Sequence, residues 1–202
     1  MNIQPILDAF PLPAKRGILS DINKDATENA IYQIIANPAE AAKALADKLL
    51  DPSDQGNDVQ ARHAMHATAI RIPVIDQKAR KTYAEALGAT LADDRPDRVK
   101  GFIIRQIQIC GGKEVTPALG KFLTVDGLAD DAAQALLAIG DGAVEHFRAA
   151  LPKTGNNATL RQINLHGLTQ LSDKSSAKAF IKALGDKDGE CRLLALWGLA
   201  QV

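Results

Sequence analysis

The sequence predicts an all-α protein built from a stack of two-helix repeats. Three observations support this fold class: a block of roughly thirty residues recurs along the chain, apolar residues fall at helical spacing within it, and no segment sustains the period-two alternation of a half-buried strand. Alanine and leucine also dominate over β-branched residues inside these segments, as helix formation favours. Repeats of this length are typical of stacked helical hairpins that bury their apolar faces against one another.

The first helix of each repeat is marked by an anchor position, usually basic, near the start of an apolar stretch. Positions three, seven and ten residues after the anchor are apolar in nearly every copy, so they share one stripe of a helix. Asn164 is the polar exception. The position six after the anchor is mostly small, including Gly167 and Gly198, which predicts a close helix–helix contact. The anchors are Arg62, Lys100, Ala129, Arg161 and Arg192.

A second helix is predicted after a break in each repeat. The breaks carry turn residues, and the Gly111-Gly112 pair is interpreted as a helix C-cap with left-handed backbone. The other breaks are Pro73, Gly140-Asp141-Gly142 and Ser172-Asp173. Second helices are expected at 77–91, 115–123, 143–151 and 175–184, and a weaker hairpin at 27–37 and 38–50.

Two regions are predicted from this pattern. Residues 27–202 form the repeat array, about five pairs of helices and an incomplete last repeat. Residues 1–26 form an N-terminal capping segment, in which a short helix within 1–10 is interrupted by Pro11-Leu12-Pro13 and helix resumes at 18–22.

Several of these repeats resemble bacterial HEAT repeats. The resemblance is carried by Asp188-Gly-Glu-Cys-Arg192 with the following Ala195, Leu196, Gly198 and Leu199, by Asn157-Ala-Thr-Leu-Arg161 with Gly167, Leu168, Leu171 and Asp173, and more loosely by Asp58-Val-Gln-Ala-Arg62. It covers about residues 27–202 and implies a right-handed superhelix of antiparallel helix pairs that acts as a scaffold. This motif is specific for a fold and carries little information on function.

The shared unit of an acidic or amide residue followed four positions later by arginine has a structural interpretation. Asp58, Asn157 and Asp188 stand where a side-chain oxygen caps the free N–H groups of the following helix. The arginines Arg62, Arg161 and Arg192 are then expected to reach a cap or carbonyl of a neighbouring repeat. Such a ladder would be weakened where Lys100 and Ala129 replace arginine.

The charge distribution favours a protein partner over nucleic acid. The chain has a formal net charge of +0, whereas sequence-independent nucleic-acid binders neutralise phosphates with clustered basic residues. The predicted second helices nevertheless lean basic. This side is either an ordinary solvated face or a basic inner surface for an acidic partner, and its candidate partner-binding residues are Lys78, Lys81, Lys121, Arg148, Lys178 and Lys182.

No residue pattern points to catalysis, a cofactor or a metal. His63 and His66 share a helical face, but no third ligand stands nearby at helical spacing. Glu145-His146 occurs once and in the reverse order of the pairs found in HEAT-like di-iron hydroxylases. Cys110 and Cys191 fall on core positions and are interpreted as buried free thiols. The chain shows no secretory signal or apolar membrane span, so a cytoplasmic location is the default expectation.

Trp197 and the last predicted helix leave alternatives open. Trp197, the sole tryptophan, is either an interface anchor or a cover for the last seam between repeats. The last helix is rich in leucine and has no predicted partner helix, which favours three interpretations: a fragment of a longer protein, end-to-end pairing with a second copy, or a fold that differs at residues 1–26.

Together these observations favour a non-enzymatic scaffold that binds a protein partner along its concave second-helix face. The alternatives are an enzyme accessory, such as a HEAT-like bilin lyase subunit, and an adaptor domain of a larger protein. A HEAT-like alkyl-base DNA glycosylase is disfavoured, because its groove needs basic and aromatic residues and the chain is only 4% aromatic.

Overall fold

A computed structural model describes residues 1–12 and 23–202, and within them the chain is helical and contains no strand, which confirms the all-α prediction. The expected helix at 18–22 lies outside the described residues. The α-helices are α1 (Gln4–Leu7), α2 (Lys24–Ala36), α3 (Pro38–Ala46), α4 (Val59–Ile75), α5 (Gln77–Thr90), α6 (Asp97–Cys110), α7 (Thr116–Gly120), α8 (Ala129–Ile139), α9 (Val144–Ala150), α10 (Ala158–Leu171), α11 (Ala177–Ala183) and α12 (Gly189–Gln201). Short 3-10 helices occupy η1 (Lys113–Val115), η2 (Leu151–Lys153) and η3 (Lys174–Ser176).

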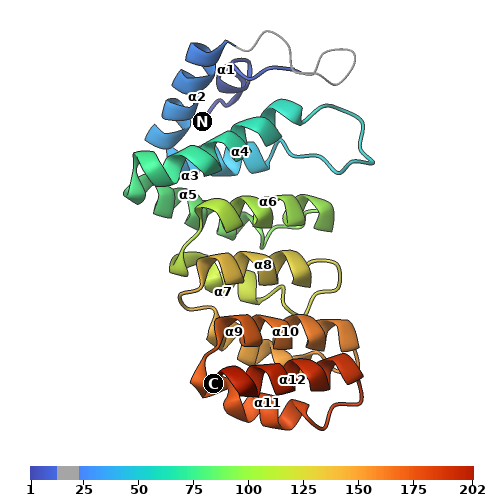
Figure 1. The fold of residues 1–202 in the computed structure, drawn as a ribbon. Coiled ribbons are helices and arrows are strands. Elements are labelled where there is room, and N and C mark those ends of the chain that lie inside the picture. Colours follow the sequence, from blue (N-terminus) through green and yellow to red (C-terminus); the bar gives the residue numbers. More distant parts are fainter. Residues whose placement is uncertain (13–22) are drawn as a thin grey trace. The chain divides into compact units, whose positions relative to one another are not determined.

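The chain divides into two compact units, and the first comprises Met1–Gly111. Its first helices pack in sequence, α2 against α4 and α4 against α6, while α3 packs against α5 (Figure 1). Each hairpin therefore contributes one helix to each of two layers. The apolar stripe of every helix is buried between them, for example Ala64, Met65 and Ile72 of α4.

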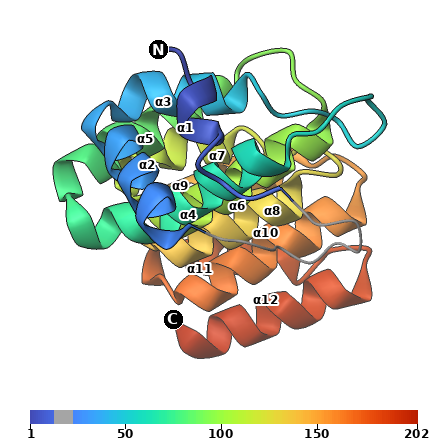
Figure 2. The ribbon, with the colours of Figure 1, turned by 90° about the horizontal axis from the view of Figure 1, so that it is seen from above.

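The second unit, Gly112–Val202, repeats this arrangement. Its first helices α8, α10 and α12 lie side by side, α7 packs against α8 and α9, and α11 packs against α12 (Figure 2). Thr169 of α10 ties two first helices together, because its hydroxyl donates to the backbone carbonyl of Leu194 in α12 at 3.2 Å.

The position six residues after each anchor, which is mostly occupied by small residues, lies at close helix–helix contacts in the second unit, as the sequence predicts. A Cβ atom on Gly167 would lie inside van der Waals distance of the Phe147 ring, and one on Gly198 would collide with the Phe180 ring. Both phenylalanines are 0% exposed and come from the second helices α9 and α11. A second-helix ring therefore lies directly on the backbone of the next first helix.

The polar exception in the apolar stripe, Asn164, is fully buried in α10. Its amide donates to the carbonyl of Leu123, beyond the end of α7, at 3.1 Å, and to that of Leu160 at 2.7 Å. The side chain therefore satisfies a carbonyl that the short α7 leaves without an intrahelical partner. Its own Oδ1 has no hydrogen-bond partner.

Helix boundaries agree with the predictions to within a few residues in most repeats, but Pro73 does not break its helix. It lies inside the last turn of α4, which continues to Ile75. Pro73 lacks the N–H that would bond the carbonyl four residues earlier, and Ile72 beside it is fully buried, which keeps the turn packed. The break falls instead at Asp76, whose carboxylate accepts from the N–H groups of Lys78 and Ala79 to cap α5.

The second helix expected at 115–123 is shorter than predicted. The chain forms η1, then the single turn and a half of α7, and then turns through the following residues. The left-handed C-cap expected at Gly111-Gly112 is also wrong. Gly111 ends α6 with φ −73° and Gly112 has φ −141°, because an extended connection leads directly into η1. Left-handed glycine occurs at Gly140 and Gly142, with φ 71° and 75°.

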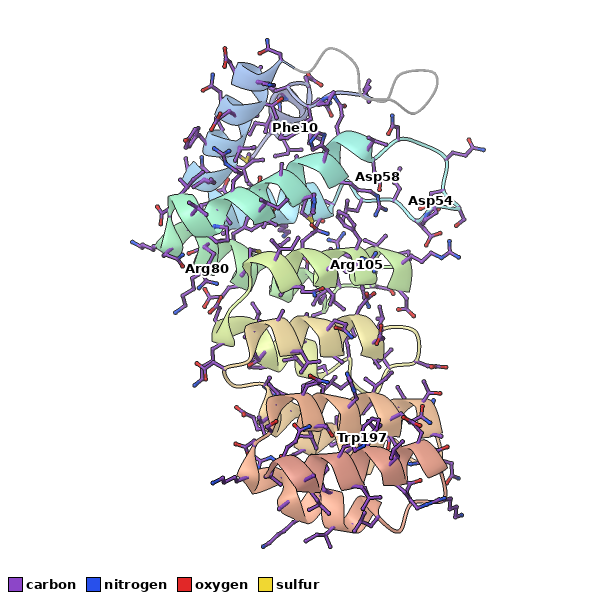
Figure 3. All side chains as sticks on the ribbon, in the orientation of Figure 1. Phe10, Asp54, Asp58, Arg80, Arg105 and Trp197 are labelled. Atoms are coloured by element: carbon purple, nitrogen blue, oxygen red, sulfur yellow. The ribbon has the colours of Figure 1, made fainter. Side chains whose placement is uncertain are left out.

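Two of the three predicted N-caps are confirmed. Asn157 Oδ1 accepts from the N–H of Leu160 at 3.1 Å, and Asp188 Oδ1 from that of Cys191 at 2.9 Å. Asp58, at the start of α4 (Figure 3), makes no such cap. Its Oδ2 accepts instead from Arg62 Nε at 2.7 Å and from the backbone N–H of Leu50 at 2.9 Å.

The described N-terminal residues pack against later helices of the first unit. Ile3, Ile6, Leu7 and Phe10 are buried, and α1 contacts α2 and α4. Gln60 of α4 donates to the carbonyl of Phe10 at 2.6 Å. The role of residues 1–26 as a cap of an array stays a prediction.

We predict that Gly198→Ala destabilises the protein by about 2 kcal/mol, because the added methyl group forces the buried Phe180 ring out of place. Gly189→Ala, in the first turn of the same helix, is the matched control. Its Cβ would meet only Arg192 Nη2 at 3.6 Å, so its stability should stay equal or rise slightly. Urea denaturation measures both. Equal midpoints for the two variants would contradict the ring-on-glycine contact.

Candidate ligand-binding site

A cavity of about 520 Å³ lies in the second unit, where α9, η2 and the start of α10 meet α11 and the loop before α12. This volume is within the range of about 300–1,000 Å³ that is usual for small-ligand sites. The cavity joins segments from two consecutive hairpins. Its lining residues are Arg148, Leu151, Pro152, Thr154, Gly155, Asn156, Arg161, Leu165, Ala179, Lys182, Ala183, Gly185, Asp186 and Lys187.

The lining has an apolar part and a cationic part. The apolar side chains come from η2, α10 and α11, and they include Leu165, which is fully buried. Four basic side chains accompany them, against one carboxylate, Asp186. The basic residues are Arg148, Arg161, Lys182 and Lys187.

Arg161 binds two inter-hairpin loops at once. Its Nε and Nη2 donate to Asp186 Oδ2 and Oδ1 at 2.7 and 3.0 Å, and its Nη1 donates to the carbonyl of Gly155 at 3.0 Å. The carbonyls of Asp186 and Lys187 also accept from Arg192 Nη1, at 2.9 and 3.1 Å. The loop at Gly185–Asp188 is therefore held by two consecutive anchor arginines.

The predicted contact of an anchor arginine with a cap or carbonyl of a neighbouring repeat is confirmed at Arg62, whose Nη2 donates to the carbonyl of Leu50, beyond the end of α3, at 2.8 Å. Arg161 reaches the next inter-hairpin loop through the carboxylate of Asp186, which caps no helix. Arg192 instead binds the loop that precedes its own helix. The anchors thus fix loops at the ends of hairpins, each in its own way.

The electrostatics of the Arg161–Asp186 pair follow from burial and charge pairing. Burial acts most strongly on Asp186 and opposes its ionisation, but hydrogen bonds from Arg161 and from the N–H of Asp188 lower its pKa below the usual value. The Asp186 hydrogen bonds in turn raise the pKa of Arg161. The pair stays ionised at neutral pH, so the Arg161 charge is already neutralised within the protein.

Of the predicted partner-binding residues, the cavity brings together Arg148 and Lys182. Arg148 Nη1 donates to Ser175 Oγ at 2.6 Å, which ties α9 to η3 and fixes the guanidinium at the cavity wall. Lys182 is exposed on α11. The other basic residues do not line this cavity. Lys178 is exposed one turn earlier on α11, Lys121 follows α7, and Lys78 and Lys81 are exposed on α5 in the first unit.

Trp197 lies on a first helix, away from the lining of the cavity. Its side chain stands on α12 (Figure 3) and is 52% exposed, and its role as an interface anchor or as a cover for the last seam stays a prediction. Leu193 and Leu196 on the same helix are 37% and 55% exposed. These side chains form an apolar surface on α12. Self-association through this surface stays a prediction.

The histidines have separate surroundings. His66 Nδ1 lies 2.8 Å from Gln106 Oε1, and the His63 ring meets Phe10 edge to face at 5.3 Å between centroids. His146 Nε2 lies 3.2 Å from Thr116 Oγ1, and His166 is exposed. No cluster of three or more His, Cys, Asp or Glu side chains suited to a metal occurs among residues 1–12 and 23–202.

Both cysteines are buried and lie outside any disulfide, as predicted. Burial is the main cause that raises the pKa of Cys191 to about 12, and the nearby Asp188 and Asp186 add to it. Because thiolates are the reactive form, Cys191 is a packing residue of α12 rather than a nucleophile.

A comparison with protein-family models finds no match, and neither does a search of curated proteins. No helix in the described residues has the length and apolar character needed to cross a membrane.

Sequence reasoning missed Lys187 and Asn156, which line the cavity from inter-hairpin loops, and assigned Arg161 to the helix ladder alone. The cavity draws on four separate stretches of chain whose meeting depends on the packing of α9, α10 and α11. A usable signal was the pairing of polar inter-hairpin loops with anchor arginines, at 153–157 and 185–189.

We predict that Asp186→Asn destabilises the protein by about 1 kcal/mol at neutral pH, because the charged partner of Arg161 is lost. The folded-state pKa of Asp186 is depressed, so its contribution is complete above the unfolded value of 3.8 and is lost as the pH falls through the folded value. The difference from the native protein should therefore vanish in acid. Thermal denaturation from pH 7 to pH 2.5 measures it, with the exposed Asp126→Asn as control. A difference that is independent of pH would contradict this assignment.

We predict that acrylamide quenches the Trp197 fluorescence efficiently in dilute protein, because half of the side chain is exposed. If the α12 surface binds a second copy, quenching should weaken as the protein concentration rises, and Leu196→Glu should remove that dependence. Strong protection at the lowest concentration would contradict the exposure of Trp197.

Proposed function

We propose that this chain is a HEAT-like right-handed α-solenoid whose repeats form one array, and that it acts as a non-enzymatic scaffold. In this proposal, an acidic partner protein binds along the second-helix face. The scaffold is of bacterial type, as the repeat resemblance implies. Two observations support this architecture. In each compact unit, the first helix of one hairpin packs against the first helix of the next. In the second unit, consecutive hairpins also meet at the glycines Gly167 and Gly198.

The observation that carries the binding part of the proposal is the composition of the second-helix side. In the second unit, the cavity carries four basic side chains and one carboxylate, and Lys178 is exposed on α11. In the first unit, Lys78 and Lys81 are exposed on α5. A surface with an excess of positive charge attracts acidic partners and raises their association rate.

The proposal predicts that reversing the basic charges of the second helices abolishes partner capture. The test variant carries Lys78→Glu, Lys81→Glu, Lys121→Glu and Lys178→Glu, and the control carries Lys24→Glu and Lys100→Glu on the first helices α2 and α6. Affinity capture from lysate of the source cells, with identification by mass spectrometry, compares both with the native protein. The expected result is an acidic protein, captured in stoichiometric amount by native chain and control, and absent from the test variant.

An unchanged capture profile in the test variant would contradict the assignment of the second-helix face. Circular dichroism verifies that each variant retains its helical content, so that loss of capture reports on the surface charge. Because each lysine in the test variant is exposed, its reversal should leave the folded structure intact.

A further inference from the structure

We infer that the cavity of the second unit is a socket for a partner segment in which an apolar side chain stands next to a carboxylate. This inference rests on the proposed function and deepens it, because it assigns one binding site within the basic face, which acts together with the lysines outside the cavity. The socket is defined by its apolar wall, Leu151, Pro152, Leu165, Ala179 and Ala183, and by its cations Arg148, Lys182 and Lys187.

The size and wall of the cavity fit the apolar part of such a segment. A volume of about 520 Å³ accommodates one or two large side chains with their backbone. The wall is supported from behind by the closely packed α9, α10 and α11, since Leu165 is fully buried and Ala183 is 7% exposed. A small residue, Ala179 of α11, leaves room that an occupant can fill.

The charges of the socket select a carboxylate beside that side chain. Arg161 is neutralised by Asp186, which leaves Arg148, Lys182 and Lys187 as the cations that form no ion pair with a lining carboxylate. Outside the lining, a hydrogen bond from the Ser175 side chain is the main cause that lowers the pKa of the Asp173 carboxylate, and the Arg148 guanidinium lies close enough to contribute to this lowering. Arg148 is held through one nitrogen by Ser175, so its guanidinium is placed before an occupant arrives. A fixed guanidinium binds a carboxylate through paired hydrogen bonds at little cost in side-chain entropy.

The lining also argues for a peptide rather than for single-stranded nucleic acid. Bases are held by stacking on aromatic side chains, and the residues that line the cavity include no aromatic residue. The loop that completes the wall is fixed by Arg161 and Arg192. The socket is therefore preformed, which reduces the cost of binding a flexible segment.

The test uses the full chain and three fluorescein-labelled octapeptides. The first alternates glutamate and leucine, the second has glutamine for glutamate, and the third has alanine for leucine. Fluorescence anisotropy should show that the first binds and that each of the others binds about tenfold or more weakly. No binding of the first peptide, or equal binding of all three, overturns the inference.

Variants locate the site. Lys182→Glu should weaken binding of the first peptide about tenfold, whereas Lys178→Glu, one turn away on α11 and outside the cavity, should change it less than about twofold. Ala179→Leu should also weaken binding, because it fills the socket without altering charge. Equal effects of Lys182→Glu and Lys178→Glu, or an unaffected Ala179→Leu, would show diffuse surface attraction and overturn the socket. A thymidine octanucleotide that displaces the peptide at lower concentration than unlabelled peptide does would assign the cavity to nucleic acid instead.

The outcomes separate this inference from the proposed function. If capture of the acidic partner responds to the four-lysine variant but not to Lys182→Glu, the partner binds elsewhere on the face and the socket is wrong. If peptide binding depends on Lys182 and Ala179 while no acidic partner is captured by the native chain, the socket stands and the scaffold proposal fails.

Discussion

The contact between a buried phenylalanine ring and a glycine backbone fixes how successive hairpins of the second unit pack. Phe147 on Gly167 and Phe180 on Gly198 use the same arrangement twice, one repeat apart. Without a side chain at the glycine, the first helix approaches the ring closely enough to exclude solvent. The first contact sets the spacing of α9 and α10 and the second that of α11 and α12, so helices on both sides of the cavity are held by such contacts.

The helices of the second unit are held together by apolar packing, whereas the loop at Gly185–Asp188 is held by hydrogen bonds from charged side chains. Arg161 and Arg192 both hold the same inter-hairpin loop. The carboxylate of Asp186 accepts hydrogen bonds from Arg161, and its backbone carbonyl accepts one from Arg192. This fixes the wall of a cavity that contains Arg148 and Lys182. A single anchor pattern in the sequence thus serves both the stacking of repeats and the shape of the candidate site.

Much of the fold follows from the sequence, because helical periodicity and the small residues six positions after the anchors report packing directly. The Gly167 and Gly198 contacts, the buried cysteines and the caps at Asn157 and Asp188 were predictable from spacing alone. Local exceptions were not. Pro73 stays helical in a turn whose neighbouring Ile72 is fully buried. Asp58 makes no cap: its backbone is not extended as at Asn157 and Asp188, and its carboxylate binds Arg62. Of the candidate site, only Arg148 and Lys182 were predicted, since the meeting of two loops with two helices is a tertiary property.

The most direct measurement is a double-mutant cycle between Gly198 and Phe180. Unfolding free energies are needed for Gly198→Ala, Phe180→Leu and the combined variant. If the ring rests on the glycine, the smaller leucine makes room for the added methyl group, and the combined variant is more stable than the sum of the single changes by about 1 kcal/mol. Strict additivity would mean that the two residues do not touch, and the stacking described for these helices would be wrong.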